Sequence, residues 1–301
     1  MCVRQEILAL YNTEVFFDEP ISKHTHYKLG GKAKYFACPK TVKDLYELLF
    51  IANTEGVKYF ILGNGSNVLA SDNGFDGIII CTKYLDFINI ENDKARCFSG
   101  VKLSTFLTTL KDNCLSGLEY LAGIPATIGG ATFMNAGAHG GCISDRVVSV
   151  QTICDGKLKK YYSNECDFSY RNSSFQRNNE VILSVDFLLE KSDYEICKSK
   201  LEHFYKLRKY LPKKNNCGCI FKNPIGTYAG KLIEQAGLKG ATIGGASVSS
   251  EHANFIETSD GATSIDVYKL INYVKDVVYK EYNVKLIEEV KFLGDFNDSN
   301  G

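Results

Sequence analysis

The chain has 301 residues, of which 45% are hydrophobic and 23% are charged, as in a globular protein that buries a core of ordinary size. Its 35 basic and 35 acidic residues cancel, so no overall charge indicates nucleic acid or a membrane surface as a partner. No apolar run approaches the ~18 residues of a membrane span, and the first residues lack the apolar core of a signal peptide.

The 11 cysteines are odd in number and form no regular framework. This favours free thiols in a reducing cytoplasm, most of them buried as small hydrophobic groups. The only close pair is Cys217 and Cys219. Because no second Cys or His pair completes a zinc ligand set, we expect no metal.

Apolar periodicity predicts a helix over residues 42–52, which Thr41 and Asp44 begin with a capping pair. Strands are predicted over 59–62, 68–70 and 77–82, and a helix over 103–113. Asp155-Gly156 is a strong two-residue turn signal, which predicts a hairpin of strands 147–154 and 157–162. A strand over 181–189 follows.

The pattern changes near residue 195, where we place a boundary. A long amphipathic helix is predicted from Cys197 to Leu211, and further helices over 228–236 and 267–278. Strands are predicted over 219–221 and 285–293, with a glycine-bearing strand region over 241–257. Since helices and strands do not alternate strictly, the predicted fold class is α+β.

The stretch from residue 123 to 141, GIPATIGGATFMNAGAHGG, contains six glycines and four alanines. Glycine at this density is typical of backbone that adopts positive φ or lies close against a ligand. The N–H groups of such a segment can donate to phosphate. We therefore favour a nucleotide-type cofactor along this backbone over the alternative, a series of tight turns between strands.

A second glycine loop, GNGSN over residues 63–67, lies between two predicted strands. Asn-Gly by itself marks many turns. Together with the segment 123–141, this loop can enclose a diphosphate from two sides. The pattern G-x-G-x-x-G between a strand and a helix is absent, which argues against a Rossmann domain.

Four further segments carry side chains that could bind an anion or take part in catalysis. Arg171, in YRNS, can hold a planar anion bidentately, although a solvated arginine in a turn explains it better when taken alone. Cys219 follows a glycine and is either a reactive thiol or a buried structural one. Glu289 alternates with apolar residues and is either partly buried or on a solvated face. The run 205–214, YKLRKYLPKK, either receives phosphates or forms a solvated helix end.

In this order the motifs resemble those of the UDP-N-acetylenolpyruvoylglucosamine reductase (UDP-N-acetylmuramate dehydrogenase, MurB) family, from Ile21 to Leu293. The most specific block is GLEYLAGIPATIGGATFMNAGA at 117–138. The short interval between YRNS and CGC resembles the branch of the family that lacks an extra substrate-covering loop. The other matching segments lie at 29–31, 63–67, 170–175, 217–224, 229–240 and 288–290.

The resemblance implies an FAD-containing, NADPH-dependent oxidoreductase of peptidoglycan synthesis, and thus of cell-wall biogenesis, cell shape and cell division. NADPH would pass a hydride to the flavin, and the reduced flavin would pass it to the vinyl carbon of UDP-N-acetylglucosamine enolpyruvate. The product would be UDP-N-acetylmuramate. The implied fold is a two-subdomain FAD-binding module of the PCMH, or vanillyl-alcohol-oxidase-like, type (residues 1–80 and 81–195). A C-terminal α+β substrate domain (residues 196–301) would follow.

By the same resemblance, three residues are catalytic. Arg171 and Glu289 would stabilise the enolate that hydride addition forms, and Cys219, where the family usually has serine, would protonate the α-carbon. Glu289 could help only if it is protonated or shares a donor, so a raised pKa is expected for its carboxyl. A thiol, with an ordinary pKa of about 8.5, is a stronger acid than an alcohol, but an ionised or oxidised thiol could not donate.

The resemblance assigns FAD to the two glycine loops and the substrate to nearby polar side chains. The expected FAD-binding residues are Gly63, Asn64, Gly65, Ser66, Asn67, Gly123, Ile124, Pro125, Gly129, Gly130, Asn135, Ala136, Gly137 and Ala138. The expected substrate-binding residues are Tyr170, Lys222, Asn223, Arg208 and Lys209, with the last two as alternatives for the diphosphate of the UDP-sugar or of NADPH.

Many relatives on this scaffold attach FAD to a histidine of the first glycine loop, and GNGSN has none, so FAD is expected to be non-covalent. One alternative is another non-covalent FAD oxidoreductase on the same scaffold. A second is a flavin-bound sensor without catalysis, against which Arg171, Cys219 and Glu289 argue. The expected partner is the UDP-sugar enolpyruvyl ether alone, without nucleic acid or membrane, and the expected state is a cytoplasmic monomer.

Overall fold

A computed structural model describes residues 3–178 and 180–296 of the chain. It divides into two compact units that are interleaved along the sequence. The first unit comprises residues 1–16, 36–64 and 78–209, and the second comprises 17–35, 65–77 and 210–301. The three-part division at residues 80 and 195 stays a prediction.

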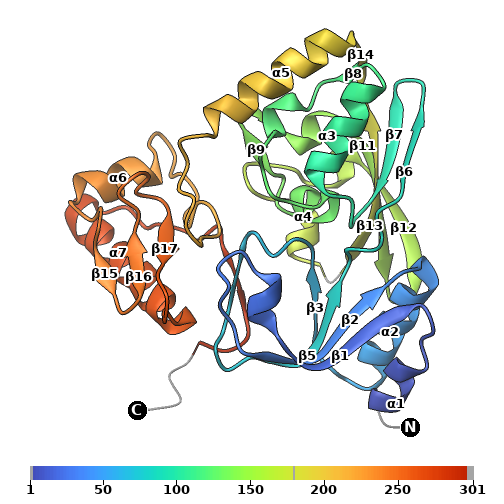
Figure 1. Cartoon of the computed structure of the whole chain (residues 1–301), viewed down its shortest axis with the longest axis horizontal. Helices are drawn as coiled ribbons and strands as arrows, with labels where there is room; N and C mark the ends of the chain where they lie inside the picture. The colour runs from blue at the N-terminus through green and yellow to red at the C-terminus, as the bar shows by residue number, and fades with distance from the viewer. Residues whose placement is uncertain (1–2, 179, 297–301) are drawn as a thin grey trace. The chain divides into compact units, whose positions relative to one another are not determined.

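The first unit is built on a five-stranded antiparallel sheet. Helix α4 (Ile128–Phe133) packs on β13 (Val181–Leu188) and β7 (Lys94–Phe98). Helix α3 (Leu103–Asp112) packs on α5 (Tyr194–Leu207), and Figure 1 shows α3 and α4 beside the sheet. The aromatic rings of Phe106 and Phe187 meet in its core at 5.0 Å between centroids. The strand order is β12 (Lys157–Tyr162), β11 (Val147–Cys154), β13 (Val181–Leu188), β7 (Lys94–Phe98) and β6 (Ile88–Glu91).

A four-stranded sheet contains β3 and β5 as a parallel pair. Two short helices, α1 (Val3–Leu8) and α2 (Val42–Thr54), pack together. The sheet order is β1 (Thr13–Pro20), β2 (Lys32–Pro39), β5 (Phe75–Cys81) and β3 (Tyr59–Leu62). Two-residue strands pair as β8 (Leu115–Ser116) with β14 (Glu190–Lys191), and β9 (Gly137–Ala138) with β10 (Gly141–Cys142).

The second unit places a long helix, α7 (Ser264–Tyr282), against a small antiparallel sheet and against α6 (Ala229–Gln235). Val267, Ile271 and Val274 bury the apolar face of α7 in the core of this unit. A parallel pair joins distant segments, β4 (Val68–Ala70) and β18 (Lys291–Leu293). The small sheet has the order β15 (Thr242–Ile243), β16 (Ala246–Val248) and β17 (Ile256–Thr258).

Short 3₁₀ turns complete the secondary structure of the described residues. They occupy Ile21–His24, Glu119–Leu121, Ile143–Asp145, Ser163–Glu165 and Ser174–Gln176. The mixture of a helix-covered antiparallel sheet with further small sheets confirms the predicted α+β class.

The predictions that depend on local sequence signals are confirmed. Thr41 begins α2, where its hydroxyl accepts a hydrogen bond from the backbone N–H of Asp44. Strands β11 and β12 form the expected hairpin, and its turn residues Asp155 and Gly156 have φ of 49° and 68°. Both angles lie in the left-handed region that a type I′ turn requires.

Three predicted elements are corrected. Residues 219–221 form no strand, because Asn254 bonds the backbone of Phe221 and only an isolated bridge to Glu288 remains. The strand predicted over 285–293 is regular only in β18, from Lys291 onward. Helix α5 ends at Leu207 rather than Leu211. The ring of Pro212 would clash with a helical carbonyl four residues earlier, and it disfavours helical geometry at the preceding residue.

Within residues 3–178 and 180–296, no helix is long and apolar enough to cross a membrane. In the same residues no group of three or more His, Cys, Asp or Glu side chains could hold a metal ion.

Candidate functional site

The first two residues of GNGSN, Gly63 and Asn64, belong to the first unit and lie beside the glycine segment 123–141. The side-chain amide of Asn64, in GNGSN, donates to the carbonyl of Pro125 at 2.9 Å. Gly63 lies so close to Thr127 that a Cβ at this position would be 2.5 Å from the threonine Oγ1. Within the first unit the structure thus brings Gly63 and Asn64 together with the segment 123–141, and the diphosphate held from two sides stays a prediction.

The segment 123–141 is more structured than a series of turns. It contains α4, whose first turn Thr127 caps by accepting from the N–H of Gly130 at 3.3 Å, and the hairpin of β9 and β10. Contacts inside the protein explain several of its glycines. A Cβ on Gly129 would lie 2.7 Å from Ser99 Cβ, and one on Gly141 would lie 2.6 Å from the ring of Tyr120. Glycine density alone is therefore not evidence of a ligand in this segment.

Gly130 is different from these neighbours. The nearest atom to a Cβ built on it is Thr127 Oγ1, at 3.5 Å, so the surrounding protein does not require glycine there. In a helix interior, glycine is less favourable than alanine by about 1 kcal/mol. An open backbone position in the first turn of α4, within the glycine segment, fits close approach by a phosphate-bearing cofactor, and the residues present are thus compatible with FAD.

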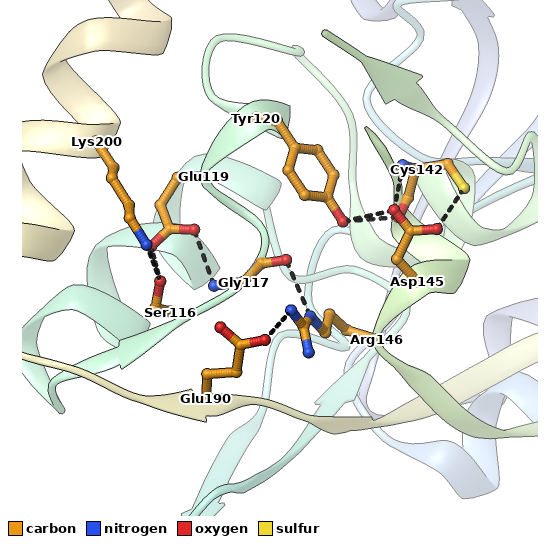
Figure 2. Close-up of polar contacts among 9 residues, drawn as sticks. All are labelled: Ser116, Gly117, Glu119, Tyr120, Cys142, Asp145, Arg146, Glu190 and Lys200. Carbon is orange, nitrogen blue, oxygen red and sulfur yellow. Dashed lines mark hydrogen bonds and ion pairs between the residues drawn. The ribbon is translucent and has the colours of Figure 1, made fainter. Parts of the chain in front are cut away.

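Polar contacts fix the far end of the segment. Figure 2 shows the hydroxyl of Tyr120 donating to the carbonyl of Cys142 and to Asp145, each at 3.0 Å. Asp145 also accepts from the Cys142 backbone N–H at 2.9 Å and from its thiol at 3.0 Å. These bonds connect the hairpin of β9 and β10 to the 3₁₀ turn at 119–121, which precedes the glycine segment.

A second set of polar side chains in Figure 2 stabilises the turn at 119–121, which precedes the glycine segment. Glu119 is buried, and it accepts from the Ser116 hydroxyl at 2.6 Å and from the Gly117 N–H at 2.8 Å. Arg146 donates to the Gly117 carbonyl and pairs with Glu190. All of these groups have partners within the protein, so they support the glycine segment rather than present free donors to a ligand.

Asn135, expected to bind FAD, is buried and its side chain is engaged within the protein. Its amide donates to the Ser169 carbonyl at 2.9 Å, and its side-chain oxygen accepts from the Ser144 N–H at 3.3 Å. Its φ of 43° makes the turn between α4 and β9. The side chain therefore positions the turn, and Asn135 could serve a cofactor through its backbone.

Arg171 lies against this same turn. One guanidinium nitrogen donates to the Gly137 carbonyl at 2.6 Å, and the guanidinium carbon lies 5.3 Å from the centre of the Tyr170 ring. Arg171 adopts φ of 52°, a left-handed conformation that costs a non-glycine residue about 1–2 kcal/mol. Gln176 stabilises it by donating to the Arg171 carbonyl at 3.1 Å. Strain maintained by surrounding hydrogen bonds is characteristic of functional positions.

The end of α5 reaches the start of the glycine segment. Gly123 leaves room for the side chain of Arg208, since a Cβ there would lie 2.8 Å from the arginine Cδ. Arg208 is half-buried, whereas Lys209 is exposed. Arg208 thus lies against Gly123, a predicted FAD-binding residue of the same unit.

In the second unit the segments of Cys219 and Glu289 run side by side. The backbone N–H of Glu289 donates to the Ile220 carbonyl at 2.7 Å, and the Lys222 N–H donates to the Ile287 carbonyl at 2.8 Å. Cys219 is half-buried and Glu289 likewise. These two predicted catalytic residues belong to the second unit, while Arg171 belongs to the first.

Cys217 and Cys219 have different environments although only Gly218 separates them. Gly218 has φ of 83°, and this sharp turn leaves Cys217 buried beside Tyr27 while Cys219 stays partly exposed. Burial raises the pKa of the Cys217 thiol to about 12, and the charges of Cys219 and Glu289 add to the effect. Cys217 is thus an inert thiol, and Cys219 is the accessible one of the pair.

Asn254 fastens the segment that follows Cys219. Its buried amide group bonds both sides of one residue: the side-chain oxygen accepts from the Phe221 N–H at 3.0 Å and the side-chain nitrogen donates to the Phe221 carbonyl at 2.8 Å. Its own carbonyl accepts from the Ile220 N–H at 2.8 Å. Sequence reasoning did not assign Asn254, because nothing local in SSEHANF indicates a partner some 30 residues away.

The lysines near Glu289 form a basic group. Desolvation, reinforced by the charge of Lys222, lowers the pKa of Lys291, while Glu289 acts in the opposite direction. Lys222 was predicted to bind substrate, and Lys291 was not. Asn223, also predicted, uses its side-chain oxygen to accept from the Ala229 N–H at the start of α6, at 3.0 Å. Glu288 is paired with Lys275 at 2.5 Å.

Similarity to known proteins extends over almost the whole chain. A family model described as UDP-N-acetylenolpyruvoylglucosamine reductase, C-terminal domain, matches residues 211–293, and one described as FAD binding domain matches residues 33–160. The chain is 38% identical over 295 residues to the UDP-N-acetylenolpyruvoylglucosamine reductase of Halalkalibacterium halodurans, covering 97% of this chain and 98% of the relative.

Solved structures extend the comparison. The UDP-N-acetylenolpyruvylglucosamine reductase (MurB) of Thermus caldophilus superposes with a TM-score of 0.81 at 30% identity, covering 94% of this chain and 99% of that one. BBE-like 1 of Physcomitrella patens superposes with a TM-score of 0.51 at 16% identity, covering 64% of this chain and 45% of that one. The second likeness concerns the fold alone.

Proposed function

Because the chain belongs to the UDP-N-acetylenolpyruvoylglucosamine reductase family, we propose that it reduces UDP-N-acetylglucosamine enolpyruvate to UDP-N-acetylmuramate, with Arg171, Cys219 and Glu289 as its catalytic residues. The enzyme is an FAD-containing oxidoreductase of peptidoglycan synthesis, with NADPH as the reductant. Bound FAD supplies hydride transfer from NADPH to the vinyl carbon of the substrate.

The cofactor would lie along the predicted residues of the two glycine loops, 63–67 and 123–138. The fastening of Asn64 to Pro125 and the open backbone at Gly130 support this assignment. Most of the other predicted contacts with FAD, in residues 63–67 and 123–138, would be made by backbone groups. Backbone N–H groups are the expected donors to phosphates. No histidine occurs in GNGSN, so we propose non-covalent FAD; acid precipitation that left yellow protein would contradict this.

Arg171 would stabilise the negative charge that hydride addition moves into the substrate carboxylate. A guanidinium is a planar cation with several donors, and one nitrogen of Arg171 donates to the Gly137 carbonyl. That bond and the strained but supported backbone fix its direction before the reaction, which is what electrostatic stabilisation of a transition state requires. Tyr170, under the same guanidinium, is the proposed substrate contact in this loop.

Cys219 would give the proton to the α-carbon, and Glu289 would help to stabilise the enolate. The observation that carries this pairing is the 2.7 Å bond between the Glu289 N–H and the Ile220 carbonyl, which aligns the two segments within one unit. Cys219 is also the accessible thiol of its pair, and only a thiol in contact with substrate can act as a general acid. Lys222 and Asn223, which follow on the same segment, are proposed to bind the substrate with Arg208 and Lys209.

We propose further that the enzyme is a cytoplasmic monomer whose partners are small molecules. Among the described residues no cysteine forms a disulfide, which supports a reducing compartment. Sedimentation of the purified protein at several concentrations tests whether it is a monomer.

The proposed function is tested by following the two half-reactions separately under anaerobic conditions. The purified protein is expected to be yellow, to bleach when NADPH is added, and to recover its colour when UDP-N-acetylglucosamine enolpyruvate follows. Bleaching without recovery would indicate another FAD oxidoreductase on the same scaffold. A colourless protein that cannot be reconstituted with FAD would contradict the cofactor assignment.

A further inference from the structure

We propose that Asn67 is a positioning residue for Glu289: it holds the backbone of the segment 289–291 and so sets the direction of the Glu289 side chain. The inference rests on the catalytic role proposed for Glu289. Sequence analysis assigned Asn67 to FAD binding, and the structure gives its side chain a different partner.

Asn67 makes two hydrogen bonds to the segment that contains Glu289. Its side-chain nitrogen donates to the Glu289 carbonyl at 3.1 Å, and its own carbonyl accepts from the Lys291 N–H at 3.0 Å. The N–H of Glu289 donates to the Ile220 carbonyl at 2.7 Å. Both peptide groups of Glu289 are therefore bonded, one to Asn67 and one to the segment of Cys219.

The ends of the β4–β18 ladder explain why an amide side chain is needed. The parallel pairing begins with Val68 opposite Lys291 and continues for three residues, so Glu289 lies just outside it. A carbonyl at this point has no partner in the regular pairing, and a half-buried carbonyl without a donor loses free energy. Asn67 places a side-chain N–H where a continued strand would have placed a backbone N–H.

The same five-residue loop thus has two attachments that involve different asparagines. Asn64 donates to Pro125 in the glycine segment of the first unit, and Asn67 donates to Glu289 in the second unit. Both bonds are of one kind, from a side-chain amide to a backbone carbonyl. Substituting each asparagine by alanine therefore gives two matched variants, and only the variant at Asn67 removes a bond to Glu289.

A displacement of about 1 Å at a reacting group can lower a rate by about a hundredfold. We therefore expect Asn67→Ala to lower the rate of flavin reoxidation by the enolpyruvyl substrate about 10- to 100-fold more than it lowers the rate of flavin reduction by NADPH. Asn67→Asp, which keeps the shape but presents an acceptor to the Glu289 carbonyl, is expected to be at least as impaired. If Asn67→Asp instead matched the wild type in reoxidation, the donated hydrogen bond would have no role and the inference would be wrong.

Asn64→Ala is the matched control. It removes the same kind of bond from the same loop, and it is expected to change FAD affinity and to lower both half-reactions by similar factors. An equal selective loss of the reoxidation step in Asn64→Ala and Asn67→Ala would assign the effect to the loop as a whole and overturn the inference.

A double-variant cycle separates this inference from the proposed function. If Asn67 acts through Glu289, the variant Asn67→Ala should cause little further loss of the reoxidation rate in a Glu289→Gln protein. A full additional loss would show that Asn67 acts independently and would overturn the inference. If Glu289→Gln alone left reoxidation unchanged, the proposed role of Glu289 would itself be wrong.

Hydrogen exchange gives a readout that does not depend on activity. In the FAD-loaded and the FAD-free protein, Asn67→Ala is expected to speed exchange of the 289–291 amides about two- to tenfold, the effect of losing one ordinary hydrogen bond. The Asn64→Ala protein should keep the wild-type rate there. Unchanged exchange in Asn67→Ala would show that Asn67 does not hold this segment.

Discussion

The glycine segment of the first unit and the Cys219–Glu289 region of the second unit are held in different ways. In the first, a short capped helix and a hairpin set the course of the backbone, and neighbouring side chains fill the space at Gly123, Gly129 and Gly141. In the second, the segments around Cys219 and Glu289 are largely irregular, and two asparagine side chains bond their backbone. A site can therefore be fixed by regular structure or by a few side-chain amides.

This difference predicts where single substitutions have large consequences. In the glycine segment, a side chain added at a packed glycine such as Gly129 clashes with the surrounding atoms. In the Cys219–Glu289 region, removing the amide of Asn254 takes the partners from the N–H and carbonyl of Phe221, and removing that of Asn67 takes the side-chain donor from the Glu289 carbonyl.

The largest expected effect is on catalysis at Cys219. If its thiol is the proton donor, Cys219→Ala should lower the rate of flavin reoxidation by substrate about 10²- to 10⁴-fold, the usual contribution of a general acid. Cys219→Ser keeps a hydroxyl donor and is expected to retain much more activity, while losing sensitivity to thiol-alkylating reagents. Stopped-flow absorbance measures both rates. Full reoxidation activity in Cys219→Ala would refute the assignment.

The second effect is on stability at Asn254. Asn254→Ala leaves the N–H and carbonyl of the buried Phe221 unpaired, so we expect a loss of about 2–4 kcal/mol in the free energy of unfolding. Denaturant titration gives the value. The control is Asn223→Ala, which removes one bond to an N–H at the start of α6 and should cost about 0.5–2 kcal/mol. Equal losses would mean that the paired bonds of Asn254 have no special importance.

A third comparison uses two adjacent glycines. Gly129→Ala would place a Cβ 2.7 Å from Ser99 Cβ, and we expect it to destabilise the FAD-free protein by about 1–3 kcal/mol. Gly130→Ala has room for its methyl group and should be neutral or stabilising by up to about 1 kcal/mol. It should nevertheless weaken FAD binding, measured by fluorescence titration. Unchanged FAD affinity in Gly130→Ala would contradict close approach of the cofactor at this position.

The smallest effect concerns pH and the sheet of the first unit. Desolvation opposes ionisation of Glu180, but hydrogen bonds from Tyr161, Thr152 and Lys159 outweigh it and lower the pKa of this carboxyl. A lowered folded-state pKa means that the stabilisation is present above the unfolded-state pKa and disappears as the pH falls through the folded-state pKa.

The Glu180→Gln protein should therefore be less stable than the wild type at pH 7, by about 1–3 kcal/mol, the range for hydrogen bonds to a charged group. The difference should shrink in acid, below the ordinary range of glutamate. Thermal melts at a series of pH values measure it. A difference that grew as the pH fell would contradict the lowered pKa.

Sequence reasoning succeeded where the signal is local. The cap at Thr41 and the turn at Asp155-Gly156 each depend on residues within a few positions, and both are confirmed. The motifs around 117–138 and 217–224 identified the family, which the comparisons confirm. The roles of Arg171, Cys219 and Glu289 stay predictions.

The sequence did not predict those features that depend on contacts between segments far apart in the chain. Alternation predicted a strand through Glu289, but regular pairing starts only at Lys291, where β4 supplies a partner. The sequence left open whether Asn254 lines the substrate domain or packs within it, and it assigned Asn67 to FAD, because their partners Phe221 and Glu289 are far away in sequence. Such bonds leave no periodic pattern in a single sequence. Glycine density also overstated the case for a ligand, since internal packing accounts for Gly129 and Gly141.

The most direct test of the account is to measure flavin reoxidation by substrate in Arg171→Ala and Glu289→Gln side by side, one residue from each unit. Both residues are proposed to serve the second half-reaction. It predicts that each variant still binds FAD and is bleached by NADPH, but recovers its colour at least about tenfold more slowly than the wild type. Reoxidation at the wild-type rate in either variant would contradict it.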